Sequence, residues 1–201
     1  MGGYQDETQT LAAALARHGL APADIRWLFC THLHIDHAGR TEDFPMTTTV
    51  IINRRELEFS VSGLSGGSYP PEDIKPLIDR LHTPGALGLL DVELTGSEEV
   101  LPGIVCRAAG AHTEGSMTIT LPTADGRATI CGDAFYNVHE QAVAPRAPLF
   151  GDPVTSNNFV VTRRSEKAAI KRILNNADVI YPSHDAPARI AHGRIVGRLP
   201  G

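Results

Sequence analysis

The sequence predicts one domain of mixed helix and strand, of the α+β class. Its 201 residues are enough for one hydrophobic core, and 42% hydrophobic against 20% charged residues is an ordinary globular composition. We find no internal repeat, low-complexity tract or linker, so we expect a single domain over residues 1–201. Helical and strand-like apolar patterns alternate along the chain, and a tight turn joins two strand-like segments in its second half.

The N-terminal half is expected to begin with a helix. An apolar stripe at helical spacing predicts that helix over residues 6–18, and Gly19 lies just beyond its end. The apolar run over residues 25–30 predicts a buried strand. The elements expected next are a strand over 48–52, a helix over 54–59, a loop over 62–71, and a helix over 72–81 that Pro76 interrupts.

The C-terminal half predicts mostly strands. The expected strands cover residues 89–94, 100–108, 117–121, 128–131, 178–181, 188–190 and 194–196. Residues 124–126, Ala-Asp-Gly, predict a hairpin turn. Residues 138–159 show no periodicity and predict a long functional loop. Ser165 is the expected N-cap of a helix that ends at Leu174 and buries Ala168, Ala169, Ile170 and Ile173.

Charge and composition exclude several classes of function. Eighteen Lys and Arg against 23 Asp and Glu give a net charge of −5, which does not suit a protein that binds nucleic acid or an anionic membrane. We find neither an apolar run near the roughly 18 residues of a membrane span nor a secretory signal. Cys30, Cys106 and Cys131 fit buried thiols in a reducing compartment. We therefore expect a cytoplasmic protein.

Nine histidines are the unusual feature of the composition. His32, His34 and His37 follow an apolar strand within six residues, together with Asp36. Side chains alternate along an extended backbone, so His32 and His34 can reach one ion, while Asp36 and His37 can reach a second where the chain turns away. Imidazole and carboxylate together suit Zn²⁺ or another borderline divalent metal, because Ca²⁺ and Mg²⁺ prefer oxygen ligands alone.

Three later segments repeat the order of apolar strand, small residues and a metal-ligand type of side chain. They end in His112, Asp133 and His184. Each of these alone is more often structural or solvated. Four strand ends that deliver seven such side chains, however, indicate a metal centre.

These motifs resemble those of the metallo-β-lactamase-fold hydrolases. The likeness covers nearly the whole chain and lies in His-x-His-x-Asp-His at 32–37, Ala-His-Thr-Glu-Gly at 111–115, Gly-Asp at 132–133 and Pro-Ser-His-Asp at 182–185. It implies an αββα four-layer sandwich with two metals at the sheet edges. By the family's pattern, one metal would be held by His32, His34 and His112, the other by Asp36, His37 and His184, with Asp133 as the bridge. Departures from the usual residues occur at Ala111, Glu114 and Ser183.

The chemistry implied by the resemblance is hydrolysis of an ester, thioester or lactone. Two cations beside one oxygen lower the pKa of a bound water to about 7 and polarise a substrate carbonyl. Asp36 would also position the hydroxide. Asp133 at the bridging position argues against the β-lactamases that use a cysteine there, and we expect Cys131 to be structural. Four histidines, His18, His82, His139 and His192, have no assigned task.

Tyr136 bears on the choice of substrate. It follows Asp133 by three residues, a spacing that resembles the N-acyl-homoserine lactonases, in which a tyrosine at that point hydrogen-bonds the substrate carbonyl. Residues 98–103 are also similar to that group. An isolated tyrosine in a loop is a packing residue about half the time. The expectation of a lactone substrate therefore rests on Tyr136 and residues 98–103 alone.

Three alternatives stay open. A thioesterase resembling the hydroxyacylglutathione hydrolases shares the seven ligands, although such enzymes usually add a C-terminal helical domain. Phosphodiester-cleaving relatives are disfavoured by the net charge of −5, and Arg163 and Arg164 are interpreted as a solvated face. The family's first N-terminal strands are expected to be missing here. Either the start of the sequence is misassigned or truncated, or the chain is a natural fragment that binds metal as a non-catalytic or partner-completed protein. A homodimer is the expected assembly, if the chain associates.

Overall fold

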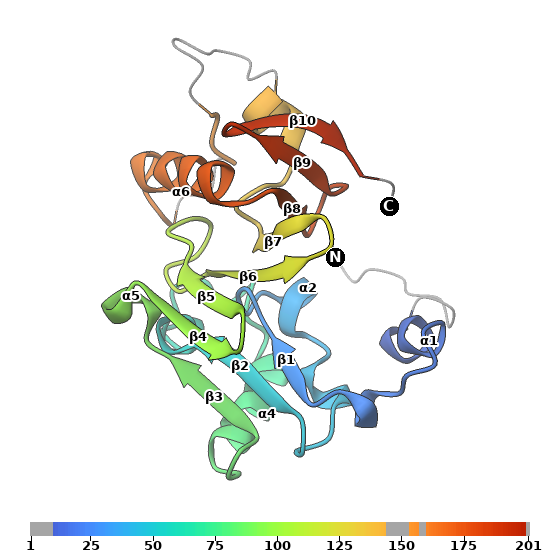
Figure 1. Ribbon diagram of the computed structural model, residues 1–201. Helices are drawn as coiled ribbons and strands as arrows, with labels where there is room; N and C mark the ends of the chain where they lie inside the picture. Colours follow the sequence, from blue (N-terminus) through green and yellow to red (C-terminus); the bar gives the residue numbers. More distant parts are fainter. Residues whose placement is uncertain (1–9, 144–152, 157–159, 200–201) are drawn as a thin grey trace.

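The computed structural model describes residues 10–143, 153–156 and 160–199. Their strands form two β-sheets that pack face to face (Figure 1). The smaller sheet has three parallel strands, β1 (Trp27–Phe29), β2 (Thr49–Asn53) and β3 (Leu87–Leu90). The larger has seven strands in the order β10-β9-β8-β7-β6-β5-β4. Their bounds are β4 (Ser97–Leu101), β5 (Ile104–Ala108), β6 (Met117–Thr123), β7 (Gly126–Gly132), β8 (Val179–Pro182), β9 (Ala188–Ala191) and β10 (Arg194–Arg198).

Alternation along β2 explains why the small sheet lies between a helix layer and the large sheet. Ile51 packs with Cys106 and Ile119 of the large sheet in the core between the two sheets. Its neighbours Val50 and Ile52 point the other way and pack under the helices α3 (Arg54–Ser60) and α4 (Pro71–Leu81). Both faces of β2 are therefore apolar, as in a strand covered on both sides.

The large sheet is covered on its outer face by α6 (Arg163–Asn176). Ile170 and Ile173 of this helix pack with Cys131 of β7 and Ile180 of β8. Strands β7 and β8 are the one parallel pair of this sheet, and α6 lies in the connection between them. The order helix, sheet, sheet, helix confirms the predicted α+β class and αββα layering.

Two strand predictions were wrong in detail. The segment 89–94 is not one strand, because β3 ends at Leu90 and a short helix α5 (Val92–Thr95) follows. The segment 100–108 is two strands, β4 and β5, joined at Pro102 and Gly103. Gly103 has φ 81°, a left-handed conformation that favours glycine, so this dipeptide is a turn signal inside an apolar run.

Two helix predictions also need correction. Helix α6 begins at Arg163, and its N-cap is Thr162, whose hydroxyl accepts a hydrogen bond from the Ser165 amide. Ala168 is exposed rather than buried. Pro76 does not interrupt α4, which runs unbroken from Pro71 to Leu81 and buries Ile74 and Leu77 on its inner side.

The ends of the chain and one loop are described only in part. The predicted helix over 6–18 is shorter than expected: α1 (Leu11–Ala16) begins after its N-cap Thr10 and is followed by a turn at 17–19, and residues 6–9 lie outside the described part. In the predicted loop over 138–159, residues 139–143 form a single π-helical turn, η4 (His139–Val143), and residues 144–152 and 157–159 lie outside the described part. The remaining short elements are η2 (Pro22–Asp24), α2 (Ile35–Ala38) and η3 (Thr41–Asp43).

The three cysteines are free and buried, as predicted. Burial raises the pKa of the Cys30 and Cys106 thiols to about 12. Among the described residues, the search for a helix with the length and apolar character needed to cross a bilayer finds none.

Candidate metal centre

Four separate segments bring the seven predicted side chains together. His32 and His34 lie in the loop that follows β1, and Asp36 and His37 lie on α2. The other three come from the large sheet: His112 from the loop after β5, Asp133 from the end of β7, and His184 from the loop after β8. The centre therefore lies where strand ends of both sheets meet.

The first group of potential ligands is the imidazole trio of His32, His34 and His112. The three ring centroids are 4.6 to 4.7 Å apart. His112 Nε2 lies 3.0 Å from His34 Nδ1. Ligand atoms of these three residues all lie within 4.8 Å of one another, close enough to surround one ion.

A second group comprises Asp36, His37 and His184. Asp36 Oδ2 lies 3.5 Å from His37 Nε2 and 3.4 Å from His184 Nε2. Like the trio, these ligand atoms lie within 4.8 Å of one another. The Asp36 side chain is 52% exposed, so its carboxylate borders the open side of the centre.

Asp133 lies between the two groups. Its Oδ1 is 3.2 Å from His37 Nε2, and its Oδ2 is 3.2 Å from His112 Nε2 and 3.3 Å from His184 Nε2. Burial works to raise the pKa of Asp133, but the contacts with His37 and Tyr136 outweigh it and hold the pKa below its ordinary value. This carboxylate is therefore ionised and faces both groups.

The donor set fits a divalent cation. His32 Nε2, His37 Nε2 and Asp133 Oδ1 are buried atoms without a hydrogen-bond partner among the described residues, which is costly for a polar group. Burial lowers the pKa of His32, and it lowers that of His112 to about 4. Both imidazoles are thus neutral near pH 7, the form that binds a metal.

Backbone geometry at two positions shapes the centre. His112 has φ 67°, an uncommon conformation for a residue other than glycine, which indicates local strain at the site. Gly132, just before Asp133, has φ 52°, and a Cβ there would lie 2.8 Å from the Thr31 hydroxyl oxygen. Thr31 in turn lies 3.2 Å from His32 Nδ1, so the other ring nitrogen, Nε2, is the one turned toward the centre.

Glu56 of α3 connects two of the ligand loops, a role that the sequence did not reveal. Its Oε1 accepts hydrogen bonds from the Leu33 amide at 3.0 Å and the Tyr69 hydroxyl at 2.9 Å. Its Oε2 accepts from the Thr113 hydroxyl at 2.6 Å and the Gly115 amide at 3.2 Å. Leu33 lies between His32 and His34, and Thr113 follows His112. One buried carboxylate therefore holds the backbone of both loops.

Tyr136 lies against the second group. Its ring stacks on His184 with centroids 4.8 Å apart and an interplanar angle of 1°. Burial and the neighbouring Asp133 raise the pKa of Tyr136, so its hydroxyl keeps its proton. Gln141, which the sequence prediction missed, accepts from the amides of Tyr136 and Asn137 and donates to the Ala134 carbonyl. This amide side chain fixes the loop that carries Tyr136.

The four unassigned histidines are exposed and lie outside these groups. His192 occupies the β9–β10 turn with φ 52°.

The chain matches a known protein family and is similar to several known proteins. A model of the metallo-beta-lactamase superfamily matches residues 2–184. Metallo-beta-lactamase domain-containing protein 1 of Xenopus laevis is 28% identical over 188 residues, covering 92% of this chain and 65% of that protein. An N-acyl homoserine lactonase of Bacillus thuringiensis is 28% identical over 131 residues, covering 65% of this chain and 46% of the lactonase.

The fold is also found among solved structures. A dizinc quorum-quenching lactonase, solved with a homoserine product, superposes with a TM-score of 0.65 at 18% identity and covers 98% of this chain and 71% of its own. At that identity the likeness speaks for the fold alone. This chain spans less than two thirds of the length of the curated relatives described above.

Proposed function

Since the chain belongs to the metallo-beta-lactamase superfamily, we propose that it is a dinuclear metal-dependent hydrolase that opens a lactone or a related small acyl ester. The observation that carries this proposal is the cluster of seven side chains with three buried, unpartnered polar atoms at its centre. We propose zinc as the metal, because imidazole and carboxylate donors suit it and a structural neighbour is described as a dizinc lactonase.

The proposed ligands divide into two sets joined by one carboxylate. One ion is assigned to His32, His34 and His112, the other to Asp36, His37 and His184, and Asp133 bridges them. The contacts of Asp133 with His112 of one set and with His37 and His184 of the other support its role as the bridge. When bound, a pair of divalent ions supplies a Lewis acid and an activated water.

The residues around the ions have separate roles in the proposed reaction. Asp36, on the open side, holds the proton of the attacking water and directs its oxygen at the substrate. The Tyr136 hydroxyl, which stays protonated, donates a hydrogen bond to the substrate carbonyl oxygen, where negative charge develops. The lactonase relatives favour a lactone over other esters.

The proposed function is tested with a substrate panel on zinc-loaded protein. The panel contains an acyl-homoserine lactone, a thioester, an aryl ester, a phosphodiester and a β-lactam. The lactone should give the highest kcat/KM. Preference for the thioester would favour the hydroxyacylglutathione hydrolase type of activity instead. If the chain binds two metals but hydrolyses none of these substrates, it is a metal-binding protein and the proposal that it is an enzyme is rejected.

Variants test the assigned residues. His34→Ala and Asp133→Ala should each abolish hydrolysis and reduce bound metal, measured by elemental analysis. His18→Ala, which changes an exposed histidine on the turn after α1, is the matched control and should keep both. Tyr136→Phe should lower kcat by at least about ten-fold with little change in metal content. An unchanged rate would remove Tyr136 from the mechanism.

Domain count, location and assembly belong to the same proposal. We propose that residues 1–201 act as one domain, and three buried free thiols support a cytoplasmic location. A homodimer is proposed as the assembly, and sedimentation of the purified chain tests it.

A further inference from the structure

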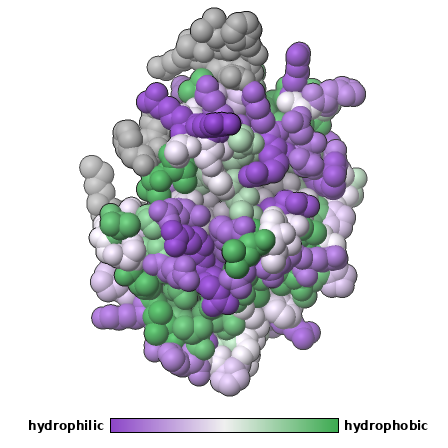
Figure 2. Space-filling model, turned by 90° about the vertical axis from the view of Figure 1, so that its left-hand side faces the viewer, coloured by the Kyte–Doolittle hydropathy of each residue, from purple (hydrophilic) through white to green (hydrophobic). Residues whose placement is uncertain are grey.

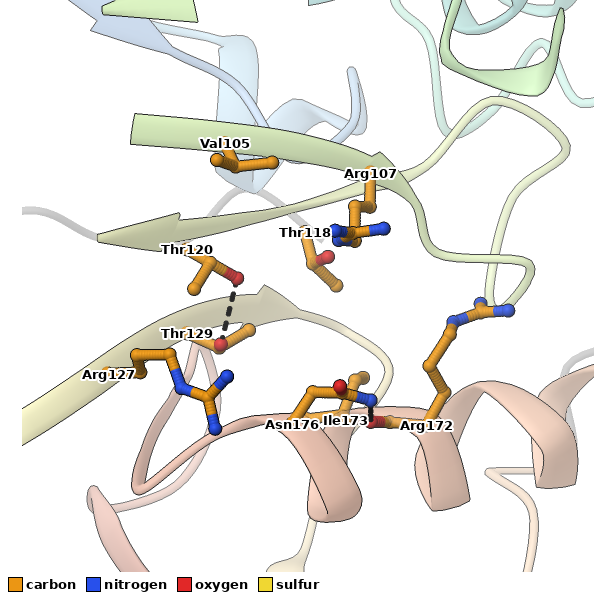
Figure 3. Close-up of a pocket in the computed structure, with 9 residues that line it drawn as sticks. All are labelled: Val105, Arg107, Thr118, Thr120, Arg127, Thr129, Arg172, Ile173 and Asn176. Carbon is orange, nitrogen blue, oxygen red and sulfur yellow. Dashed lines mark hydrogen bonds between the residues drawn. The ribbon is translucent and has the colours of Figure 1, made fainter. Parts of the chain in front are cut away.

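A cavity lies on the outer face of the large sheet, apart from the metal centre. Its volume is about 250 Å³, and it lies between α6 and strands β5, β6 and β7 (Figure 3). None of the seven proposed ligands lines it. Figure 2 views the molecule from the side of α6 and shows hydrophilic side chains gathered over its upper half, where this helix lies.

Three arginines from three different elements surround the cavity. Arg107 comes from β5, Arg127 from β7 and Arg172 from α6. No acidic residue lines it. Helix α6 carries five of the chain's 18 Lys and Arg and a single acid, Glu166, which is buried. A local excess of positive charge thus exists in a chain whose net charge is −5.

The three guanidinium groups differ in how far neighbouring residues fix or neutralise them. Nη2 of Arg172 donates to the carbonyl oxygens of Ala108 at 3.2 Å and Ala109 at 2.6 Å, which fixes the side chain. Arg107 has no acidic partner in residues 10–143, 153–156 and 160–199. Arg127 Nε lies 3.7 Å from Asp178 Oδ2, a long ion pair, and the same oxygen accepts from the Arg127 amide at 2.8 Å.

Hydroxyl groups line the floor of the cavity. Thr120 and Thr129 face it from β6 and β7, and their hydroxyls lie 3.0 Å apart. Thr118 of β6 also lines the cavity. A hydroxyl that lines a cavity can donate a hydrogen bond to a molecule that enters it.

We propose that this cavity binds the phosphate group of a small soluble molecule. Guanidinium forks match phosphate oxygens, and three of them with three hydroxyls offer more donors than a carboxylate could accept. A tetrahedral dianion presents acceptors toward the strands and toward α6 at once. The volume is below the roughly 300 Å³ at which pockets for drug-sized ligands begin, so the organic part of the ligand is small.

Calorimetric titration of the metal-loaded protein at constant ionic strength tests the proposal, with phenyl phosphate, inorganic phosphate and benzoate as probes. Phenyl phosphate should bind saturably and at least about ten-fold more tightly than benzoate, a difference of about 1.4 kcal/mol. Equal binding of the two, or no saturable binding of phenyl phosphate, overturns the proposal. So does binding to phosphatidic acid vesicles without binding of phenyl phosphate.

Variants locate the binding, because phosphate can also bind at a metal centre. Arg107→Gln and Arg172→Gln should each weaken phenyl phosphate binding at least about ten-fold, since a charged hydrogen bond is lost. Thr118→Val keeps the shape of the side chain and should weaken binding more modestly. Arg194→Gln, an exposed arginine on β10, is the matched control and should change nothing. If Arg107→Gln and Arg172→Gln, both folded by circular dichroism, bind like wild type, the phosphate binds elsewhere and the proposal is wrong.

Discussion

Glu56 is a buried carboxylate that interacts with four donors and with no cation among them. Burial raises its pKa, so keeping this acid inside the protein is costly unless all four donors are in place. Its contribution is geometric, because it fixes the backbone beside His32, His34 and His112. We regard it as a positioning residue of the metal centre.

Glu56→Gln should weaken metal binding about 10- to 100-fold, the usual effect of losing an outer partner of the ligands. The amide cannot accept all four hydrogen bonds, so the two ligand loops lose their common anchor. Competition with a chromophoric chelator measures the affinity. Glu58→Gln, an exposed acid on the same helix, is the control. Equal affinities of both variants would show that the carboxylate does not position the loops.

The cysteine thiols predict a pH effect. Folding raises the pKa of Cys30 and Cys106 from 9.0 to about 12. The protonated thiol is the form favoured in the folded state. Its contribution to stability is therefore complete below pH 9.0 and is lost as the pH rises toward 12. At pH 8 a thiol reagent should label the native protein only as fast as it unfolds, whereas rapid native labelling would contradict the burial.

At the residue scale, the sequence could predict which side chains cluster at the candidate metal centre but not the residues that hold their loops. His32, His34, Asp36 and His37 are close in the chain, and the other proposed ligands follow apolar strands, so local patterns reveal them. Glu56 bonds to the Leu33 amide 23 positions away and to Thr113 57 positions away. Only folding brings such partners together. The one local signal was an acid on the buried side of a helix with Leu57 and Phe59.

Helix α6 joins the core of the large sheet to the proposed phosphate site. Its inner side packs on β7 and β8, and its Arg172 lies at the cavity between the helix and the sheet. The Thr162 hydroxyl accepts from the Ser165 amide and so caps an end that would otherwise leave amides unpaired. Ser165 itself donates its hydroxyl to the Gly110 carbonyl at 2.7 Å, close to the loop of His112.

Thr162→Ala should lower the free energy of unfolding by about 1 kcal/mol, the usual effect of losing an N-cap. Urea unfolding followed by circular dichroism measures it. Thr47→Ala changes an exposed threonine in the turn before β2 and should have little effect. Comparable losses in both variants would mean that the Thr162 contact contributes nothing specific.

At the element scale, apolar runs predicted which segments are buried. They were less successful in predicting where each helix or strand begins and ends. Residues 100–108 form a continuous apolar stretch apart from Pro102, Gly103 and Arg107, yet Gly103 turns the chain back between β4 and β5. Pro76 shows the opposite case, since burial of Ile74 and Leu77 outweighs one lost backbone hydrogen bond. Local backbone conformation decided the first outcome, and tertiary packing decided the second.

At the scale of the molecule, the proposed metals bridge the two sheets. His32 and His34 follow β1 of the small sheet, and Asp133 and His184 follow strands of the large one. Bound metal should therefore stabilise the packing of the sheets against each other. The αββα layering could be predicted from the resemblance to the metallo-β-lactamase-fold hydrolases. The cationic cavity could not be predicted, because the net charge of −5 is a sum over the whole chain and does not reveal a local group of arginines.

Removing the metals with EDTA should lower the melting temperature by several degrees. A ligand at 100 times its dissociation constant stabilises the folded state by about 2.7 kcal/mol. Differential scanning calorimetry with and without added zinc measures the shift. The Asp133→Ala variant should show a much smaller response, and an equal response in that variant would place the stabilising ions elsewhere.

The strand order of the large sheet has a kinetic consequence. Neighbouring strands of this sheet are consecutive in the chain, and only the β7–β8 pair needs a helical crossover. Contacts between near neighbours close small loops and form early in folding. The proposed ligands span residues 32 to 184 and come from both sheets, so they meet only when the sheets dock. In a refolding experiment, secondary structure should therefore return before the capacity to bind zinc.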